Sequence, residues 1–487
     1  MRETKLSLTN NIKGNIIIME KNQFSDSEMF TENTELNRRL GLTEAFSIVV
    51  GRIIGSGIFR TPGPIMMLVA SISMFYGVWI VGGIATLLGA FCYAELAAMM
   101  PRSGGPYAYL KAAYPPVWTF LRGWAMFFVS ETGAIAAVAL VFAEYTNALY
   151  AIFTGNYYPL GVEIVIALFI IWGLTTVNCF GVVIGGILQD IFSFIKLLAL
   201  GAVIFVGFTK AGELSHFTTQ FWPEEFNWAS MLAFGAAMRY GFFAYSGWEG
   251  ATYIAEEVKN PRKNLPLSII LGISGIMLLY LAANSAYIYQ LPIDQIKGES
   301  SKWVAVDAMK MAVGTAGGVL ISLAVMLNTF GNVSAQILCK ARTWYAMSRD
   351  GLFIKSLSKI HPKYKTPNAA LIVQAAWASL LLMGAAFAEN AYETIIDFFS
   401  FTSSIFNVST FAAIWVLRRK YPNVPRPYRT WGYPVTLIIV LIIQLWFMIT
   451  TLITAFIPSL LGIILTCTGL VYYYRDNIGE SIRRYLK

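Results

Sequence analysis

Charged residues are scarce in this chain of 487 residues: Asp, Glu, Lys and Arg together make up 13%, against 56% hydrophobic residues. The mean hydropathy is correspondingly high, at +0.59. A soluble domain of this length cannot hide so much apolar surface in its core. The composition therefore excludes a soluble globular protein and places the chain in a lipid bilayer.

Histidine and cysteine are also rare, with two and four residues respectively. Both histidines, His216 and His361, fall in loops between apolar runs, and no two cysteines have the spacing of metal ligands. No metal site or other cofactor is therefore expected, and the cysteines are expected to be free thiols packed as small apolar residues. The chain also lacks paired carboxylates in one motif and a nucleophile with a nearby base, so it is not expected to be an enzyme.

The basic residues give a formal net charge of +9, but they form no tract that would bind nucleic acid. They concentrate in alternate loops between the apolar runs, at residues 38–39, 102–111, 259–263, 342–365, 418–429 and 475–484. Lys and Arg are enriched in cytoplasmic loops of membrane proteins. Both termini are therefore predicted to face the cytoplasm, in a multi-pass protein of the cell membrane.

Twelve apolar runs have roughly the 20-residue length that crosses a bilayer as a helix. They begin near Leu42, Phe75, Trp118, Val162, Ile187, Met231, Leu265, Val304, Ala369, Ile395, Val435 and Ile457. The flanking residues 1–38 and 476–487 are predicted to be cytoplasmic tails. The predicted fold is thus an all-α membrane protein with twelve transmembrane helices.

Two of these runs are interrupted by glycine in mid-membrane. The first contains GRIIGSG at residues 51–57, and the sixth contains YSGWEG at residues 245–250. Interrupted segments at corresponding positions of two halves are typical of inverted-repeat transporters. We therefore predict a five-plus-five inverted repeat with broken first and sixth helices, its halves at residues 39–208 and 227–417 and the last two helices within residues 430–475.

A helix that unwinds at the midplane is chemically suited to a free amino acid. Unwinding frees backbone N–H and C=O groups, which a membrane tolerates only where they line a cavity or meet a ligand. The N-terminus of the continuing half-helix favours a carboxylate, and the freed carbonyls favour an ammonium group. The alternative is that the glycines only allow close helix packing; two clusters at matching positions favour binding.

Four stretches of the chain, at residues 51–63, 93–110, 243–266 and 340–353, read GRIIGSGIFRTPG, YAELAAMMPRSGGPYAYL, FAYSGWEGATYIAEEVKNPRKNLP and KARTWYAMSRDGLF. They resemble the amino acid-polyamine-organocation transporter superfamily and, within it, bacterial relatives of the L-type amino acid transporters. The resemblance implies the five-plus-five repeat with two further helices, working by alternating access on free amino acids.

The resemblance also implies roles for individual residues. The backbone at Ser56 and Gly57 would hold the substrate carboxylate, and the carbonyls of Ile53, Phe243 and Ser246 would hold its amino group, with the Phe243 ring as a gate. The implied substrate-binding residues are Ile53, Ser56, Gly57, Phe243, Ala244, Ser246 and Glu249.

Lys196 matches a fifth-span lysine that takes the place of a sodium ion in sodium-independent relatives. An ionisable group within a span is costly and marks a functional site. Lys196 is either a fixed charge bonded to the unwound carbonyls of the first span or a group that loads and loses a proton. Both interpretations remove the need for sodium.

The chain departs from the L-type pattern in three places. The loop at residues 150–161 lacks the cysteine that tethers a heavy subunit in eukaryotic members, so no disulfide-linked partner is expected. Glu249 stands where L-type members usually carry an amide, and it resembles the acidic residue of the cationic amino acid and polyamine branches. Arg52 replaces a small residue in the first broken helix, and the resemblance gives it no role.

Glu249 has three open interpretations: recognition of a cationic side chain, coupling of transport to pH, or membership of a polar network within the bundle. Glu131 and Arg239 also fall within predicted spans, and we predict that they form an ion pair with each other. Asp397 is expected near a helix end, with a structural role.

The predicted function is a sodium-independent secondary transporter of free amino acids, an exchanger of small or neutral ones. The alternative is a proton-coupled or antiport transporter of cationic amino acids or polyamines. Glu249 favours the alternative, and the surrounding FAYSGW stretch favours the neutral substrate.

Overall fold

The protein is described here by a computed structural model. It describes residue 30 and residues 38–102, 105–180, 183–210, 212–298, 301–349 and 351–475. The two predicted tails lie outside the described residues, apart from Phe30 and Arg38.

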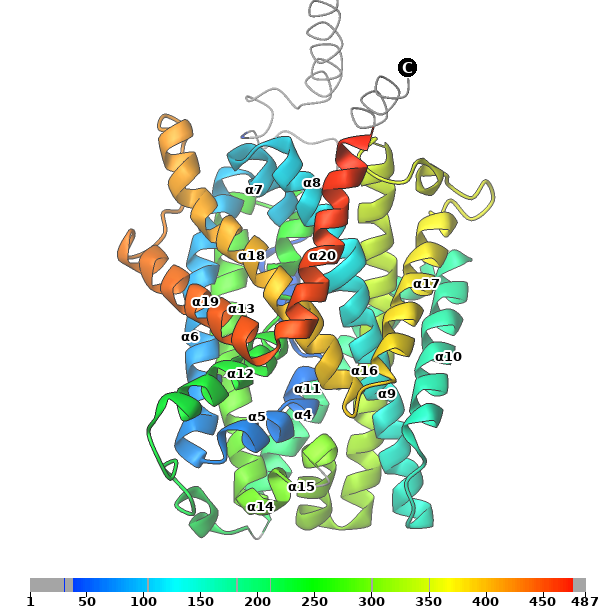
Figure 1. The fold of residues 1–487 in the computed structure, drawn as a ribbon, viewed down its shortest axis with the longest axis vertical. Helices are drawn as coiled ribbons and strands as arrows, with labels where there is room; N and C mark the ends of the chain where they lie inside the picture. The colour runs from blue at the N-terminus through cyan, green and yellow to red at the C-terminus, as the bar shows by residue number, and fades with distance from the viewer. Residues whose placement is uncertain are drawn as a thin grey trace, which may run out of the picture.

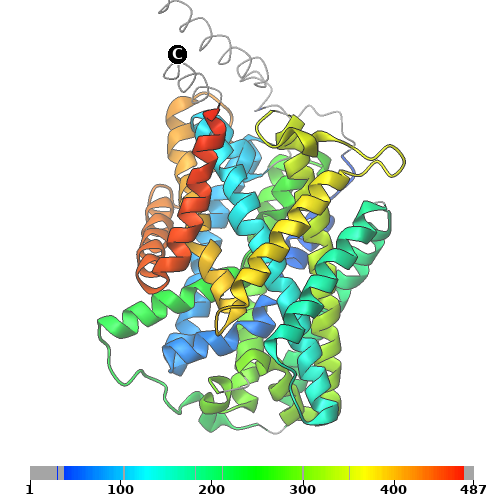
Figure 2. The ribbon, with the colours of Figure 1, turned by 45° about the vertical axis from the view of Figure 1, so that its right-hand side comes forward.

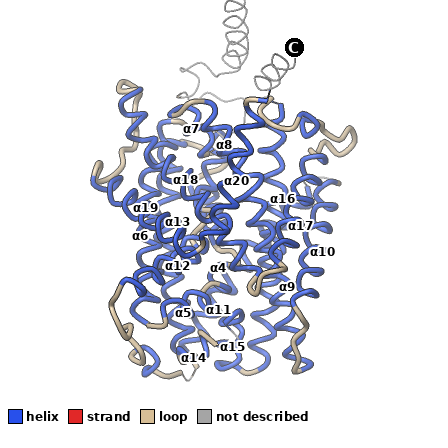
Figure 3. Tube along the Cα trace, viewed as in Figure 1, coloured by secondary structure: helices blue, strands red, loops and turns tan. Residues whose placement is uncertain are grey.

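Regular structure in these ranges is helical, apart from one isolated β-bridge between Leu40 and Val258 (Figure 3). The α-helices are α3 (Leu42–Ile53), α4 (Gly57–Arg60), α5 (Pro62–Val69), α6 (Ile72–Met99), α7 (Pro106–Ala113), α8 (Pro116–Ala125), α9 (Glu131–Thr154), α10 (Leu160–Cys179), α11 (Val183–Thr209), α12 (Trp228–Ala244), α13 (Pro261–Gln290), α14 (Ile293–Ile296), α15 (Val304–Val313), α16 (Thr315–Arg349), α17 (Asn368–Ala385), α18 (Ala391–Lys420), α19 (Val435–Thr454) and α20 (Phe456–Tyr473). The short 3-10 or π segments are η1 (Met126–Ser130), η2 (Leu214–Phe217), η3 (Trp248–Glu257), η4 (Ser301–Trp303) and η5 (Lys355–Ser358).

Ten helices or continuous helical segments of the described chain are long and apolar enough to cross a membrane. The helices α11 and α12 occupy the positions of the predicted fifth and sixth spans, and α12 has 17 residues before it reaches a break. The predicted start of the eighth span, Val304, is wrong. The short helix α15 ends there at Gly314, whose positive φ of 71° turns the chain, and the long apolar helix α16 begins only at Thr315.

The long helices stand side by side as a bundle in both ribbon views (Figures 1 and 2). Within it α13 packs against α6 and α3, and α16 packs against α9 and α11. Helices α7 and α8 lie at one end, where α20 also ends, and α5, α14 and α15 lie at the opposite end (Figure 1). These two ends are called the α8 end and the α14 end below.

The first apolar helix is broken as its glycines predict. Helix α3 ends at Ile53, three residues are not helical, and α4 runs only from Gly57 to Arg60 before α5 begins at Pro62. A proline at the first position of a helix is favourable because its missing N–H would have no partner there. The helix is therefore interrupted at residues 54–56, and the short helices α4 and α5 follow the interruption (Figure 1).

The sixth helix is broken as well. Helix α12 ends at Ala244, and after a turn the chain continues from Trp248 as the 3-10 segment η3. Gly247 has a φ of 97°, a conformation that side-chain-bearing residues rarely adopt. Both predicted breaks are thus confirmed at the predicted residues.

Candidate functional site

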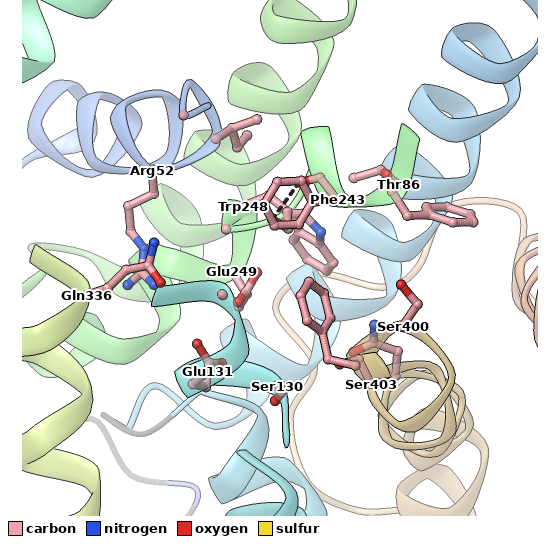
Figure 4. A pocket seen from close by; sticks show the side chains of 18 of the residues that line it. Arg52, Thr86, Ser130, Glu131, Phe243, Trp248, Glu249, Gln336, Ser400 and Ser403 are labelled. Atoms are coloured by element: carbon pink, nitrogen blue, oxygen red, sulfur yellow. Dashed lines mark hydrogen bonds between the residues drawn. The ribbon is translucent and has the colours of Figure 1, made fainter. Parts of the chain in front are cut away.

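A cavity of about 250 Å³ lies where the two breaks meet in the bundle. Residues of α3, α6, α7, α8, η1, α9, α11, α12, η3, α16, α18 and α19 line it, together with the linkers at both breaks. Figure 4 shows Arg52, Glu131, Phe243 and Glu249 gathered around this space. We call it the central cavity.

Six of the predicted site residues line the central cavity and two do not. Those that line it are Ile53, Lys196, Ser56, Phe243, Ser246 and Glu249. Gly57 and Ala244 instead pack against each other: a Cβ atom on Gly57 would lie 2.5 Å from the Ala244 Cα and 2.9 Å from its Cβ. For Gly57 the packing interpretation of the glycine clusters is therefore supported, because any side chain would collide with the backbone of the other broken helix.

The two breaks also touch at two further points. A Cβ on Gly247 would lie 2.8 Å from the Arg52 carbonyl oxygen. The hydroxyl of Tyr280, a fully buried residue of α13, lies 3.0 Å from the Ile53 carbonyl oxygen and 3.1 Å from that of Ala244. One hydroxyl proton serves one of these carbonyls at a time. Tyr280 thus pins the end of α3 to the end of α12.

The sequence gives little sign of Tyr280, because a tyrosine in an apolar helix does not reveal what its hydroxyl meets. Its partner carbonyl on Ile53 was predicted to hold a substrate amino group. The Phe243 carbonyl, predicted for the same task, accepts hydrogen bonds from the Ser246 hydroxyl at 2.7 Å and the Ser246 N–H at 3.1 Å. Both carbonyls therefore have partners within the protein.

Lys196 on α11 is 4% exposed, and its Nζ donates a hydrogen bond to the Gly51 carbonyl oxygen at 3.2 Å. The last intrahelical hydrogen bond of α3 runs from the Ile54 N–H to the Val50 carbonyl oxygen. The Gly51 carbonyl is one residue further along, and the carbonyls at the end of a helix have no intrahelical donor. The lysine ammonium therefore occupies a carbonyl that the break has freed.

The predicted ion pair between Glu131 and Arg239 is wrong. Glu131 pairs with Lys340 at 2.6 Å, and Arg239 pairs with Asp397 at 2.9 Å. Sequence spacing does not show which faces of two distant helices meet. Here α16, which carries Lys340, packs along α9, which carries Glu131.

Positive charge exceeds negative charge around the central cavity. The charged residues that line it are Arg52, Arg122, Lys196, Arg239, Lys340, Glu131 and Glu249. The Arg52 guanidinium, for which the sequence suggested no role, lies 5.4 Å from the centre of the Tyr253 ring and faces the same space as Glu249 (Figure 4). A cationic ligand would enter a site that already contains more cations than carboxylates.

The cavity wall is also rich in hydroxyl and amide groups. Those outside the predicted set are Thr86, Tyr93, Ser130, Asn332, Gln336, Ser400, Ser403, Ser404, Asn407 and Gln444. The hydroxyl oxygens of Ser56 and Ser130 are buried without a hydrogen-bond partner among the described residues. Buried polar atoms are normally satisfied, so these two are available to a polar ligand.

Ser130 and Glu131 reach the cavity through a local irregularity. They lie where the π-helical segment η1 joins α9, and such segments shift the register of the side chains that follow. Helical periodicity alone therefore could not place Ser130 on the cavity wall. Its signal in the sequence is weak.

Cys339 also lines the cavity and is exposed, whereas Cys92 is buried. The expectation that all four cysteines pack as apolar residues is therefore wrong for Cys339, and Cys467 is exposed as well. None of the four is joined in a disulfide. Within the described residues, no three His, Cys, Asp or Glu side chains come together as metal ligands would.

A helical membrane bundle that encloses a small polar cavity between two interrupted helices defines a carrier of small polar solutes. The sequence profile of the family described as "Amino acid permease" matches residues 40–472. The chain belongs to this family: it is a multi-pass membrane protein of amino acid transport, and not an enzyme.

Three relatives show the extent of the similarity. The mouse (Mus musculus) large neutral amino acids transporter small subunit 2 is 34% identical over 81% of this chain and 73% of its own length. The serine/threonine exchanger SteT of Bacillus subtilis (strain 168) is 31% identical over 92% of this chain and 98% of its own. The mouse b(0,+)-type amino acid transporter 1 is 30% identical over 91% of this chain and 88% of its own.

Proposed function

We propose that this protein is a sodium-independent exchanger of small or neutral amino acids that works by alternating access. The observation that carries the proposal is the hydrogen bond from Lys196 to the Gly51 carbonyl. A sodium ion in this place would be coordinated by such freed carbonyls. A lysine that already occupies the carbonyl supplies the positive charge permanently, so the carrier cycle needs no sodium.

The cargo is held at the first break in this proposal. The N–H groups at Ser56 and Gly57 start the half-helix α4 and receive the carboxylate, and the Ser56 hydroxyl supplies a further donor. Gly57 contributes its backbone only, since its Cα packs on Ala244. The amino group binds near the Ile53 and Phe243 carbonyls, which each have a second lone pair to offer.

The charge of the cavity supports a neutral cargo. Glu249 lines it, but so do Arg52 and Arg122, in addition to the basic residues that are paired. The net positive charge disfavours arginine or a polyamine by several kcal/mol when the site closes and excludes water. A volume of about 250 Å³ and a hydroxyl-rich wall suit small polar amino acids, as does the relative named a serine/threonine exchanger.

The architecture in this proposal is the five-plus-five inverted repeat with two further helices. Helices α11 and α12 then cross the membrane in addition to the ten candidate spans, and the α8 end faces the cytoplasm of a cell that carries the protein in its plasma or inner membrane. One relative is named as a small subunit. The loop between α9 and α10 in this chain has no cysteine, which supports action without a disulfide-linked heavy subunit.

The test is uptake of a labelled amino acid panel into proteoliposomes, with and without internal amino acid. We expect uptake of small neutral amino acids that depends on internal amino acid and stays nearly unchanged when choline replaces sodium. A strict sodium requirement would contradict the role of Lys196. Uptake that is independent of internal amino acid but driven by a proton gradient, and strongest for arginine or putrescine, would support the alternative function.

A further inference from the structure

Arg122 is a cation of the central cavity that forms no ion pair within the part of the chain that the structure describes. It lies on α8, near the α8 end of the bundle, and is 7% exposed, yet its side chain lines the cavity. Its Nε atom has no hydrogen-bond partner among the described residues. A guanidinium presents five N–H donors, and leaving them unsatisfied in a buried place is costly.

The acidic residues near Arg122 are bound to other groups or lie too far away. Glu131 pairs with Lys340 at 2.6 Å, and Asp397 pairs with Arg239. Glu249 and Arg122 form no ion pair within 4.0 Å. The Arg122 Cζ lies over the ring of Phe406, 5.6 Å from its centre. A cation–π contact at this distance satisfies none of the N–H donors.

The surroundings of Arg122 distinguish it from the break region. Tyr93 near the end of α6, Pro106 at the start of α7 and Asn407 on α18 line the cavity together with Arg122. Helices α7 and α8 lie at the α8 end, whereas α4 lies deeper in the bundle (Figure 1). The cavity therefore extends from the breaks toward the α8 end, and Arg122 marks that part of it.

We propose that Arg122 binds the carboxylate of the amino acid cargo at a second subsite, on the route between Ser56 and the α8 end. This inference rests on the proposed exchange of amino acids. A planar guanidinium matches a carboxylate through two parallel hydrogen bonds. A carboxylate that leaves the N–H groups at Ser56 and Gly57 then passes to a second set of donors, and a carboxylate that enters from the α8 end meets Arg122 first.

The experiment compares right-side-out and inside-out membrane vesicles, so that labelled alanine is offered to one face at a time. For Arg122→Gln we expect the half-saturating concentration to rise about 10- to 100-fold on the face of the α8 end, the range for losing a charged hydrogen bond. On the opposite face it should change less than about two-fold. Arg122→Lys keeps the charge but cannot form the two parallel hydrogen bonds of a guanidinium. It should give an intermediate rise in the half-saturating concentration on the same face.

Arg342→Gln is the matched control, because it removes the same charge from an exposed arginine on α16 that does not line the cavity. It should leave both half-saturating concentrations unchanged. If Arg122→Gln fails to fold, the face-specific rise in Arg122→Lys decides the question. No change in Arg122→Gln on either face would overturn the subsite, and so would an equal rise on both faces.

A second cargo separates two sources of the carboxylate. If Arg122→Gln raises the half-saturating concentration only for aspartate and glutamate and leaves that for alanine unchanged, the guanidinium binds an acidic side chain. The proposed second subsite for the cargo carboxylate is then wrong. A parent protein that exchanges no amino acid would contradict the proposed function itself. A parent that exchanges alanine normally, with an unaffected Arg122→Gln variant, would contradict only the role of Arg122.

Discussion

Arg60 and Glu144 are joined by two hydrogen bonds, from Nε to Oε2 at 2.6 Å and from Nη2 to Oε1 at 3.1 Å, in a place where neither side chain is more than 2% exposed. The Arg60 Cζ also lies 4.4 Å from the centre of the Tyr392 ring, and Tyr392 packs edge-on against Phe243 at 6.1 Å. This cluster ties α4 to α9 and α18 between the central cavity and the α14 end.

Replacing Glu144 by Gln should destabilise the protein strongly. The change keeps the shape but removes the carboxylate that is hydrogen-bonded to the buried Arg60 guanidinium, a loss that costs about 3–5 kcal/mol for a buried pair. The measurement is thermal unfolding in detergent, followed by size-exclusion chromatography of the remaining folded protein. Glu389→Gln, at an exposed residue, is the control and should behave as the parent.

A double variant sharpens this prediction. Arg60→Met with Glu144→Leu removes both charges and should recover much of the lost stability, since an apolar pair needs no hydrogen bonds. Parent-like stability in Glu144→Gln alone would show that the ion pair contributes little to the stability of the fold.

Gly57→Ala should impair both folding and exchange. The added Cβ meets the Ala244 Cα at 2.5 Å, and backbone cannot move aside as a flexible side chain can. Overpacking of this kind costs about 1–3 kcal/mol. Gly201→Ala on α11 is the control, because nothing lies within 4 Å of its added Cβ. Thermal stability and alanine exchange are measured for both variants. Equal values for Gly57→Ala and Gly201→Ala would refute the close contact between Gly57 and Ala244.

Glu249→Gln separates the two candidate substrates. With a neutral cargo the amide keeps its hydrogen-bonding capacity, and exchange of neutral amino acids should persist. With a cationic cargo the loss of a charged partner would cost roughly 2–5 kcal/mol, or about thirty-fold or more in affinity. We expect the neutral outcome.

The measurement for Glu249→Gln is competition against labelled alanine by serine, leucine, arginine and putrescine, at acidic and at neutral pH. Strong competition by arginine or putrescine in the parent, lost in the variant, would reverse the choice of substrate. Persistent neutral competition with a flatter pH dependence would leave Glu249 as a pH-sensitive residue of the wall.

Cys339 offers a test of the topology. It is exposed in the central cavity, whereas Cys92 is buried. A membrane-impermeant thiol reagent should therefore inhibit exchange when applied from the cytoplasmic face, and bound substrate should slow the reaction. Cys339→Ser should abolish the inhibition, and Cys467→Ser should not. Inhibition from the outer face alone would reverse the predicted orientation.

The sequence by itself determined the class of this protein and the places where its helices break. Long apolar runs without the alternation of a β-barrel satisfy their backbone in a bilayer as helices, so the all-helical class follows from composition. The breaks follow from local chemistry too, since Gly247 needs a positive φ that only glycine adopts easily. Six of the site residues implied by the family resemblance line the central cavity, and their binding roles stay predictions.

Only the tertiary structure decided which charges meet. Glu131 binds Lys340 and Arg239 binds Asp397, because the rotation of each helix within the bundle selects the face that it presents. In a chain that is apolar on every side of most helices, no amphipathic pattern records that rotation. Packing likewise turned Gly57 toward Ala244 and brought the Tyr280 hydroxyl between the two breaks. It also left the Arg122 Nε on the cavity wall with no hydrogen-bond partner among the described residues.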